Sequence, residues 1–171
     1  CGTCDLAMAF SGLGSVVGCD FCAPMLHVAA GKIQRRKAGE PISLLGADAL
    51  MLPFADGTFD IVVSAFVLRN LAEMDRGLLE MRRVLRPGGV VGILEFGMPR
   101  VPLLSALYRV YFTKILPMLG KVISGVDGPY TYLPASVQSF PPGEVLKQKL
   151  ERAGFQSVEF KPLTGGVAIL L

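Results

Sequence analysis

All four cysteines of the chain lie within its first twenty-two residues, as two C-x2-C pairs separated by fourteen residues. Two such pairs can supply four thiolates to a structural Zn²⁺ ion. The same stretch also contains a glycine turn followed by a short strand that ends in an acid, which is typical of a nucleotide-cofactor site. The two interpretations predict different chemistry for the same residues.

The zinc interpretation conflicts with the local pattern. Zinc-binding cysteine pairs usually lie in tight turns, whereas residues 5–10 have the pattern of a helix start and Cys19 belongs to a predicted strand. Cysteine is also an ordinary small buried residue. We therefore expect no metal ion, although neighbouring strand ends of a parallel sheet could still bring the two pairs together.

The cofactor interpretation begins with a glycine turn that opens a helix. Gly2 and Thr3 form this turn, where the backbone can approach a ligand closely, and Asp5 lies at the helix start. A helix N-terminus favours an anionic group. The alternative role of Asp5 is that of a simple helix cap.

Further acids follow where successive strands end. Asp20 follows the predicted strand Ser15–Cys19 and can accept hydrogen bonds from ribose hydroxyls. Asp48 and Ala49 follow the next strand, at the edge where an adenine would lie. Each acid alone could be a turn residue, but their order on successive units favours a cofactor site.

The elements that must position these residues alternate between strand and helix. The predicted strands are Ser15–Cys19, Ile42–Leu45, Phe59–Ala65 and Val90–Phe96, and the predicted helices are Ala23–Lys37, Met74–Leu85 and Glu144–Ala153. Such alternation predicts an α/β fold with a mostly parallel twisted sheet and helices on both faces. Two closing strands, Ser157–Lys161 and Val167–Leu171, could pair antiparallel across a short link.

Length and composition exclude several classes of protein. A chain of 171 residues fits a single domain, and a net charge of +3 does not indicate a nucleic-acid partner. No uninterrupted apolar run reaches the roughly 18 residues of a spanning helix. The clustered cysteines favour a reduced, cytoplasmic protein. The chain has no initiator Met and starts inside the turn, so we expect further residues before Cys1.

Longer blocks of sequence carry a specific resemblance. These blocks are residues 46–60 (GADALMLPFADGTFD), Leu68-Arg69-Asn70, Arg86-Pro87-Gly88-Gly89, Leu94-Glu95-Phe96, Tyr130-x-Tyr132-Leu133 and Phe140-Pro141. Together they resemble the class I S-adenosylmethionine-dependent methyltransferases, and within them the ubiquinone/menaquinone biosynthesis C-methyltransferase family. The resemblance covers nearly the whole chain.

The resemblance implies a Rossmann-like fold and S-adenosylmethionine as cofactor, with residues 1–171 as one methyltransferase domain. It implies methyl transfer to a ring carbon of a prenylated quinol. The cofactor-binding residues that it implies are Gly2, Thr3, Asp5, Asp20, Phe21, Asp48, Ala49 and Ser64. Residues 99–140 would form a helical and loop insertion over the substrate, which could also touch a membrane surface or be an ordinary helical cap.

Catalytic candidates follow from the need to stabilise a phenolate oxygen or to remove a proton. Arg69 and Asn70, just beyond a strand end, are the first choice; the alternative for Arg69 is a surface cation that caps the next helix. Asp127, Tyr130 and Tyr132 are the second choice, with loop packing as their alternative.

One residue departs from the resemblance. Cys4 stands where the turn usually has its last glycine, so its Cβ could crowd the cofactor or strain the backbone. Alternative functions are a methyltransferase acting on another small molecule, an NAD-dependent dehydrogenase, or a non-catalytic zinc-structured module. A homodimer and peripheral contact with the inner face of a membrane stay open.

Overall fold

The computed structural model describes residues 1–36, 41–97, 136–137 and 140–171. The chain divides into two compact units, Cys1–Ala65 with Glu73–Val91 and Phe66–Ala72 with Gly92–Leu171. Each unit is described by itself. The predicted catalytic residues Asp127, Tyr130 and Tyr132, and most of the predicted 99–140 insertion, lie outside the described residues.

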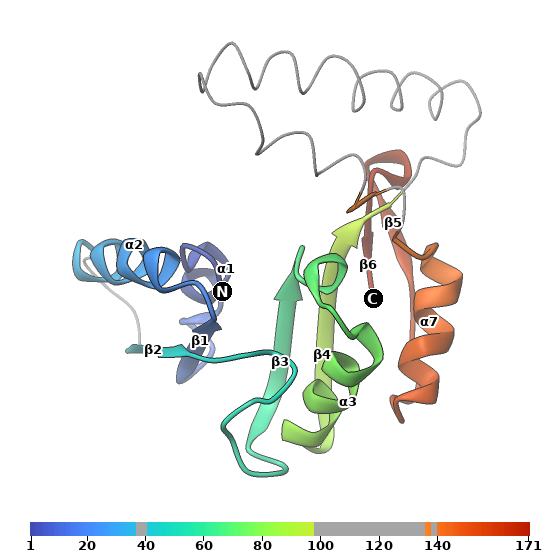
Figure 1. The fold of residues 1–171 in the computed structure, drawn as a ribbon, viewed down its shortest axis with the longest axis horizontal. Helices are drawn as coiled ribbons and strands as arrows, with labels where there is room; N and C mark the ends of the chain where they lie inside the picture. Colours follow the sequence, from blue (N-terminus) through green and yellow to red (C-terminus); the bar gives the residue numbers. More distant parts are fainter. Residues whose placement is uncertain (37–40, 98–135, 138–139) are drawn as a thin grey trace. The chain divides into compact units, whose positions relative to one another are not determined.

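The first unit begins with the predicted helix, strand, helix and strand. These are α1 (Asp5–Phe10), β1 (Val16–Asp20), α2 (Ala23–Gln34) and β2 (Ile42–Gly46), shown in blue to cyan in Figure 1. β1 and β2 pair in parallel, with Asp20 opposite Gly46. Parallel pairing needs a crossover, and α2 supplies it. The carboxyl ends of the two strands therefore meet at one edge of this sheet.

A small apolar cluster joins these elements. It consists of Cys4, Ala7 and Ala29, with partly buried residues such as Val16 and Leu44 packed against it. Small side chains at its centre allow α1 and α2 to pack closely. Cys4, the last residue before α1, therefore fixes the preceding turn to this cluster.

The first unit also contains β3 (Phe59–Ala65), α3 (Met74–Val84) and the first part of β4 (Leu85–Phe96). α3 is amphipathic as predicted, and Leu78, Met81 and Val84 are buried on one face. β3 and β4 belong to a four-stranded sheet of order β3-β4-β6-β5.

The second unit contains the end of β4, the short 3-10 helix η1 (Leu68–Asn70), α7 (Gly143–Arg152), β5 (Lys161–Leu163), the turn η3 (Thr164–Gly166) and β6 (Ala168–Leu170). β6 pairs antiparallel with both β4 and β5, so the predicted antiparallel closing strand is confirmed. Glu95 lies opposite Ile169 in this register.

Several predicted boundaries are wrong. The strand expected over Ser157–Lys161 begins only at Lys161, because Ser157 has a φ of 53°, which is incompatible with an extended strand. β4 begins at Leu85 rather than Val90 and runs through the Pro-Gly-Gly segment, where Gly88 has a φ of 78°. The helix expected to reach Lys37 ends at Gln34.

Candidate functional site

Asp20 organises the turn at the start of the chain. Its Oδ2 accepts hydrogen bonds from Gly2 N at 2.7 Å and from Cys1 N at 3.0 Å, and its Oδ1 accepts one from Cys22 N at 2.9 Å. Partial burial alone would raise the pKa of Asp20, but the backbone hydrogen bonds from Cys22 and Gly2 lower it below its ordinary value. Asp20 is thus an ionised acceptor at the end of β1.

The residues beside Asp20 leave space for a ligand. Gly2 has a φ of +54°, and no atom lies within 4 Å of the position that a Cβ there would occupy. The Phe21 side chain is 85% exposed, although Phe is among the most apolar residues. The Asp20 carboxylate therefore links two features that a ligand could use. It is hydrogen-bonded to the open turn at Gly2, and the exposed ring of Phe21 follows it in the chain.

The loop after β2 lies next to the end of β1. Ala47 N donates to Asp20 O at 3.1 Å. Asp48 begins a tight turn, in which its Oδ1 accepts from Leu50 N at 2.9 Å and its backbone oxygen accepts from Met51 N at 3.1 Å. The structure therefore brings Asp20, Asp48 and Ala49 to one edge of the parallel pair.

Thr3 and Asp5 form a polar cluster with Lys32 of α2. Lys32 Nζ donates to Thr3 Oγ1 at 2.8 Å and to both Asp5 oxygens, and Thr3 Oγ1 donates to Asp5 Oδ2 at 2.7 Å. The bond from Lys32 lowers the pKa of Asp5. Asp5 is the first residue of α1, after the N-cap residue Cys4, and its carboxylate binds Lys32 and Thr3.

Cys4 occupies a position that favours glycine. Its φ is 74°, in the left-handed region, and its side chain is fully buried in the apolar cluster with Ala7 and Ala29. The predicted backbone strain is therefore present. Because the thiol is enclosed in the core, its Cβ does not project from the protein surface.

The cysteines are all free thiols. Among the residues that the structure describes, no group of three or more His, Cys, Asp or Glu side chains could hold a metal ion. Burial raises the pKa values of Cys4 and Cys19, which disfavours the thiolate form that zinc requires.

Ser64, in β3, is a buried polar residue with an unusual lack of partners. The residue is 6% exposed, and its Oγ has no hydrogen-bond partner within the described part of the chain. Native buried hydroxyls almost always have one. An unpartnered buried hydroxyl is therefore available to a ligand.

Arg69 lies in η1 and is buried rather than exposed. Its Nη1 lies 2.9 Å from Glu95 Oε2, and the two side chains are 7% and 0% exposed. Its guanidinium carbon also lies 5.3 Å and 4.9 Å from the ring centroids of Phe66 and Phe96. The alternative of a surface cation is wrong. Its Nε donor has no partner among the described atoms.

The sequence prediction missed Glu95 as a functional residue. Its Oε1 accepts a hydrogen bond from Leu68 N at 2.8 Å, so one carboxylate holds both the backbone of η1 and the Arg69 side chain. The sequence did contain an indication of this role, because Glu95 is a carboxylate among apolar residues of a predicted buried strand. Asn70, in contrast, is exposed, and its Nδ2 donates to Phe66 O at 3.2 Å.

A mainly apolar cavity of about 300 Å³ lies in the second unit at the end of β4. Its lining includes Phe96, Val137, Phe140, Phe160 and Ile169. Phe96 thus contributes to the cavity and also contacts Arg69 through its ring face.

Comparison with known proteins identifies the family. The model of the ubiE/COQ5 methyltransferase family matches residues 1–170. The chain is 47% identical to a demethylmenaquinone methyltransferase of Thermus thermophilus over 172 residues, which covers 99% of this chain and 77% of that protein. It is 40% identical to the ubiquinone/menaquinone biosynthesis C-methyltransferase UbiE of Bdellovibrio bacteriovorus, covering 99% and 73%.

A solved structure supports the fold. A SAM-dependent methyltransferase from Methanosarcina mazei superposes with a TM-score of 0.70 at 21% identity, over 99% of this chain and 86% of that one. This similarity confirms the predicted Rossmann-like class I fold. From the matched family and these relatives, the chain belongs to the ubiE/COQ5 methyltransferase family and is an S-adenosylmethionine-dependent methyltransferase.

Proposed function

We propose that this protein methylates a ring carbon of a prenylated quinol in menaquinone or ubiquinone biosynthesis. The observation that carries the substrate class is the 47% identity to a protein named demethylmenaquinone methyltransferase. When bound, S-adenosylmethionine supplies a methyl group that leaves its sulfonium sulfur for the ring carbon, and the ring then loses its proton from that carbon.

The residues of the first unit fit this cofactor. Asp20 holds the turn with three hydrogen bonds, yet two carboxylate oxygens can accept about four, so capacity remains for a ribose hydroxyl. The space beside Gly2 admits a ligand against the backbone. We propose that Phe21 contacts the adenine through its exposed ring, and that Asp48 and Ala49 contact its edge.

Three further residues complete the proposed cofactor site. Thr3 and Asp5 hold the turn to α2 through Lys32, which fixes the backbone that faces the ligand. Ser64 offers the unpartnered hydroxyl described above. An unpartnered buried polar group costs about 1–3 kcal/mol, so a ligand that satisfies it gains affinity.

Arg69 is our proposed contact to the quinol. Its charge is partly balanced by Glu95, but its Nε–H has no partner among the described atoms and can donate to a developing phenolate oxygen. Stabilising that oxygen makes the neighbouring ring carbon more nucleophilic. Asn70 could donate to the second ring oxygen, and Asp127, Tyr130 and Tyr132 stay candidates for the proton acceptor.

The location of the protein follows from the proposed substrate. Within the described residues, no helix combines the length and apolar character needed to cross a bilayer. We propose a cytoplasmic protein that takes its prenylated quinol from the inner face of a membrane. Co-sedimentation with lipid vesicles tests this contact, and analytical ultracentrifugation tests whether the chain forms a homodimer.

The function is tested by methyl transfer from radiolabelled S-adenosylmethionine to a short-chain demethylmenaquinol. The matched control acceptor is the same quinol with a methyl group already at the reactive carbon, and a second control is the oxidised quinone. We expect labelled product only from the reduced, unmethylated acceptor. Label in the methylated control would indicate an oxygen acceptor, and no transfer to any quinol would overturn the proposal.

A further inference from the structure

The loop that carries Asp48 and Ala49 is clamped to α3 by Arg83 and Glu80. We propose that Arg83, with Glu80, is a positioning residue for this loop and thereby sets cofactor affinity without touching the cofactor. The inference rests on the proposed cofactor role of Asp48 and Ala49.

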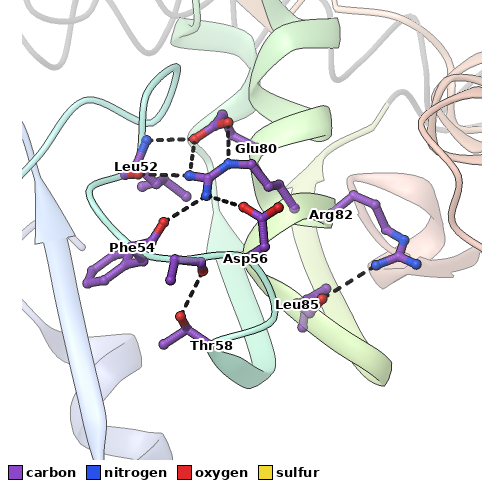
Figure 2. A network of polar contacts seen from close by, with 9 residues as sticks. Leu52, Phe54, Asp56, Thr58, Glu80, Arg82 and Leu85 are labelled. Carbon is purple, nitrogen blue, oxygen red and sulfur yellow. Dashed lines mark hydrogen bonds and ion pairs between the residues drawn. The ribbon is translucent and has the colours of Figure 1, made fainter.

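The Arg83 guanidinium uses all five of its N–H donors. Nε donates to Glu80 Oε1 at 2.8 Å; Nη1 donates to Phe54 O at 2.7 Å and to Asp56 Oδ1 at 2.8 Å; Nη2 donates to Leu52 O and to Glu80 Oε2, both at 2.8 Å. Figure 2 shows Leu52, Phe54, Asp56 and Glu80 gathered in this network of polar contacts. Only arginine has five donors in a planar fork, so lysine cannot reproduce the set.

Glu80 holds the same loop through a second route. Its Oε2 accepts a hydrogen bond from Leu52 N at 2.8 Å, while Arg83 binds Leu52 O. Both backbone polar groups of Leu52 are therefore fixed by α3. The bond from Arg83 lowers the pKa of Glu80, so the carboxylate stays charged at neutral pH.

The clamp connects directly to the proposed adenine edge. Met51, the residue before Leu52, donates its N–H to Asp48 O at 3.1 Å, and Asp48 and Met51 form an isolated β-bridge. On the other side, Ala47 N donates to Asp20 O. The Asp48 turn is thus held at one end by β1 and at the other by α3. Loss of Arg83 would leave the bond from Leu52 N to Glu80 as the remaining link described here between the second end and α3, and would loosen that end.

The next arginine in the chain, Arg86, supplies a matched control. Arg86 forms an ion pair with Asp60, which lies outside residues 47–56, and both side chains are 60% exposed. Arg86→Lys therefore removes a guanidinium from the same unit without affecting the loop. Asp56→Asn provides a milder variant, because it weakens one of the five bonds at a carboxylate that is 82% exposed.

The experiment measures S-adenosylhomocysteine affinity by calorimetry and amide hydrogen exchange of residues 47–56 in the full chain. For Arg83→Lys we expect affinity to fall about tenfold, as the loss of one or two hydrogen bonds implies. We also expect KM for S-adenosylmethionine to rise by more than kcat falls, and exchange in the loop to accelerate. Arg86→Lys should match the wild type, and Asp56→Asn should lie between.

The outcomes separate this inference from the proposed function. Wild-type affinity and unchanged loop exchange in Arg83→Lys and Asp56→Asn would overturn the positioning role. A wild-type protein that binds no S-adenosylhomocysteine would instead overturn the proposed cofactor site, and loop exchange would still decide whether Arg83 orders the loop. If Arg83→Lys unfolds, Asp56→Asn keeps both measurements decisive.

Discussion

Arg69 and Glu95 form a buried ion pair between η1 and β4, with 2.9 Å between Nη1 and Oε2. The same carboxylate accepts a hydrogen bond from the Leu68 backbone N–H, so it binds both the Arg69 side chain and the backbone of η1. Removing one member of such a pair leaves the other charge buried, whereas removing both can be nearly neutral.

Glu95→Gln should therefore destabilise the protein by about 3 kcal/mol, because Arg69 then lacks its anion while the bond to Leu68 survives. The double variant Arg69→Met/Glu95→Gln should recover most of that loss. Urea unfolding of the two variants checks this order. A double variant less stable than Glu95→Gln would show that the guanidinium stabilises mainly through Phe66 and Phe96.

The same double variant tests catalysis apart from stability. With the fold restored, we expect kcat to stay at least about 100-fold below wild type, the usual loss for one donor to a developing oxyanion. S-adenosylhomocysteine affinity should stay unchanged. Arg69→Lys should recover part of kcat, since its ammonium also donates. Wild-type turnover in the double variant would exclude Arg69 from the reaction.

The stability of Cys4 variants should depend more on backbone conformation than on side-chain volume. Cys4→Ala keeps the strained φ of 74° and loses the buried thiol, while Cys4→Gly loses slightly more volume but removes the strain. Since a non-glycine residue in this region costs about 1–2 kcal/mol, we expect Cys4→Gly to be the more stable of the two. Thermal unfolding gives the order, and the reverse order would mean that core packing dominates.

Asp20 predicts a pH dependence of stability. Its folded pKa is lowered by the hydrogen bonds of the turn despite partial burial, so the carboxylate stabilises the fold above its unfolded pKa of about 3.9. That contribution is lost as the pH falls through the folded pKa. Asp20→Asn should thus be less stable than wild type at pH 7, and the difference should shrink below pH 4.

The control for Asp20 is Asp60→Asn, whose ion pair with Arg86 is solvent-exposed and contributes little. Urea titrations at a series of pH values compare the two variants. A constant difference between Asp20→Asn and wild type from pH 7 to pH 3 would argue against a lowered pKa at Asp20.

Ser64→Ala should separate stability from ligand binding. Because the Oγ has no described partner, its removal should raise the free energy of unfolding by about 1 kcal/mol in the free protein. Affinity for S-adenosylhomocysteine should fall about three- to tenfold, as expected for one lost hydrogen bond. Ser11→Ala is the matched control, since Ser11 is also buried but donates to Met8 O at 2.8 Å and accepts from Arg36, and its replacement should destabilise.

The sequence predicted most of the elements because their patterns are local. β3 begins and ends at the predicted residues, Phe59 and Ala65, and α3 differs by one residue at its end. β1 ends at Asp20, so the acid stands at a strand end as expected. Alternating apolar runs and glycine or proline breaks are enough to give such boundaries.

The side-chain network of the site could not be predicted in the same way. The partner of Arg69 lies 26 residues later in β4, and the loop bonds of Arg83 reach 27 to 31 residues back. Such pairings depend on tertiary register, which periodicity does not report. The strand expected at Ser157 failed for this reason, because tertiary context overrode the local pattern.

The Arg83 contacts also bear on protein engineering. Every N–H of this guanidinium is matched to an acceptor on the 52–56 loop or on Glu80, so loop and helix are complementary parts of one unit. A graft that moved only the loop into another methyltransferase would leave its carbonyl groups unsatisfied. Transplanting adenine-edge specificity from this protein would therefore require moving residues 80 and 83 together with the loop.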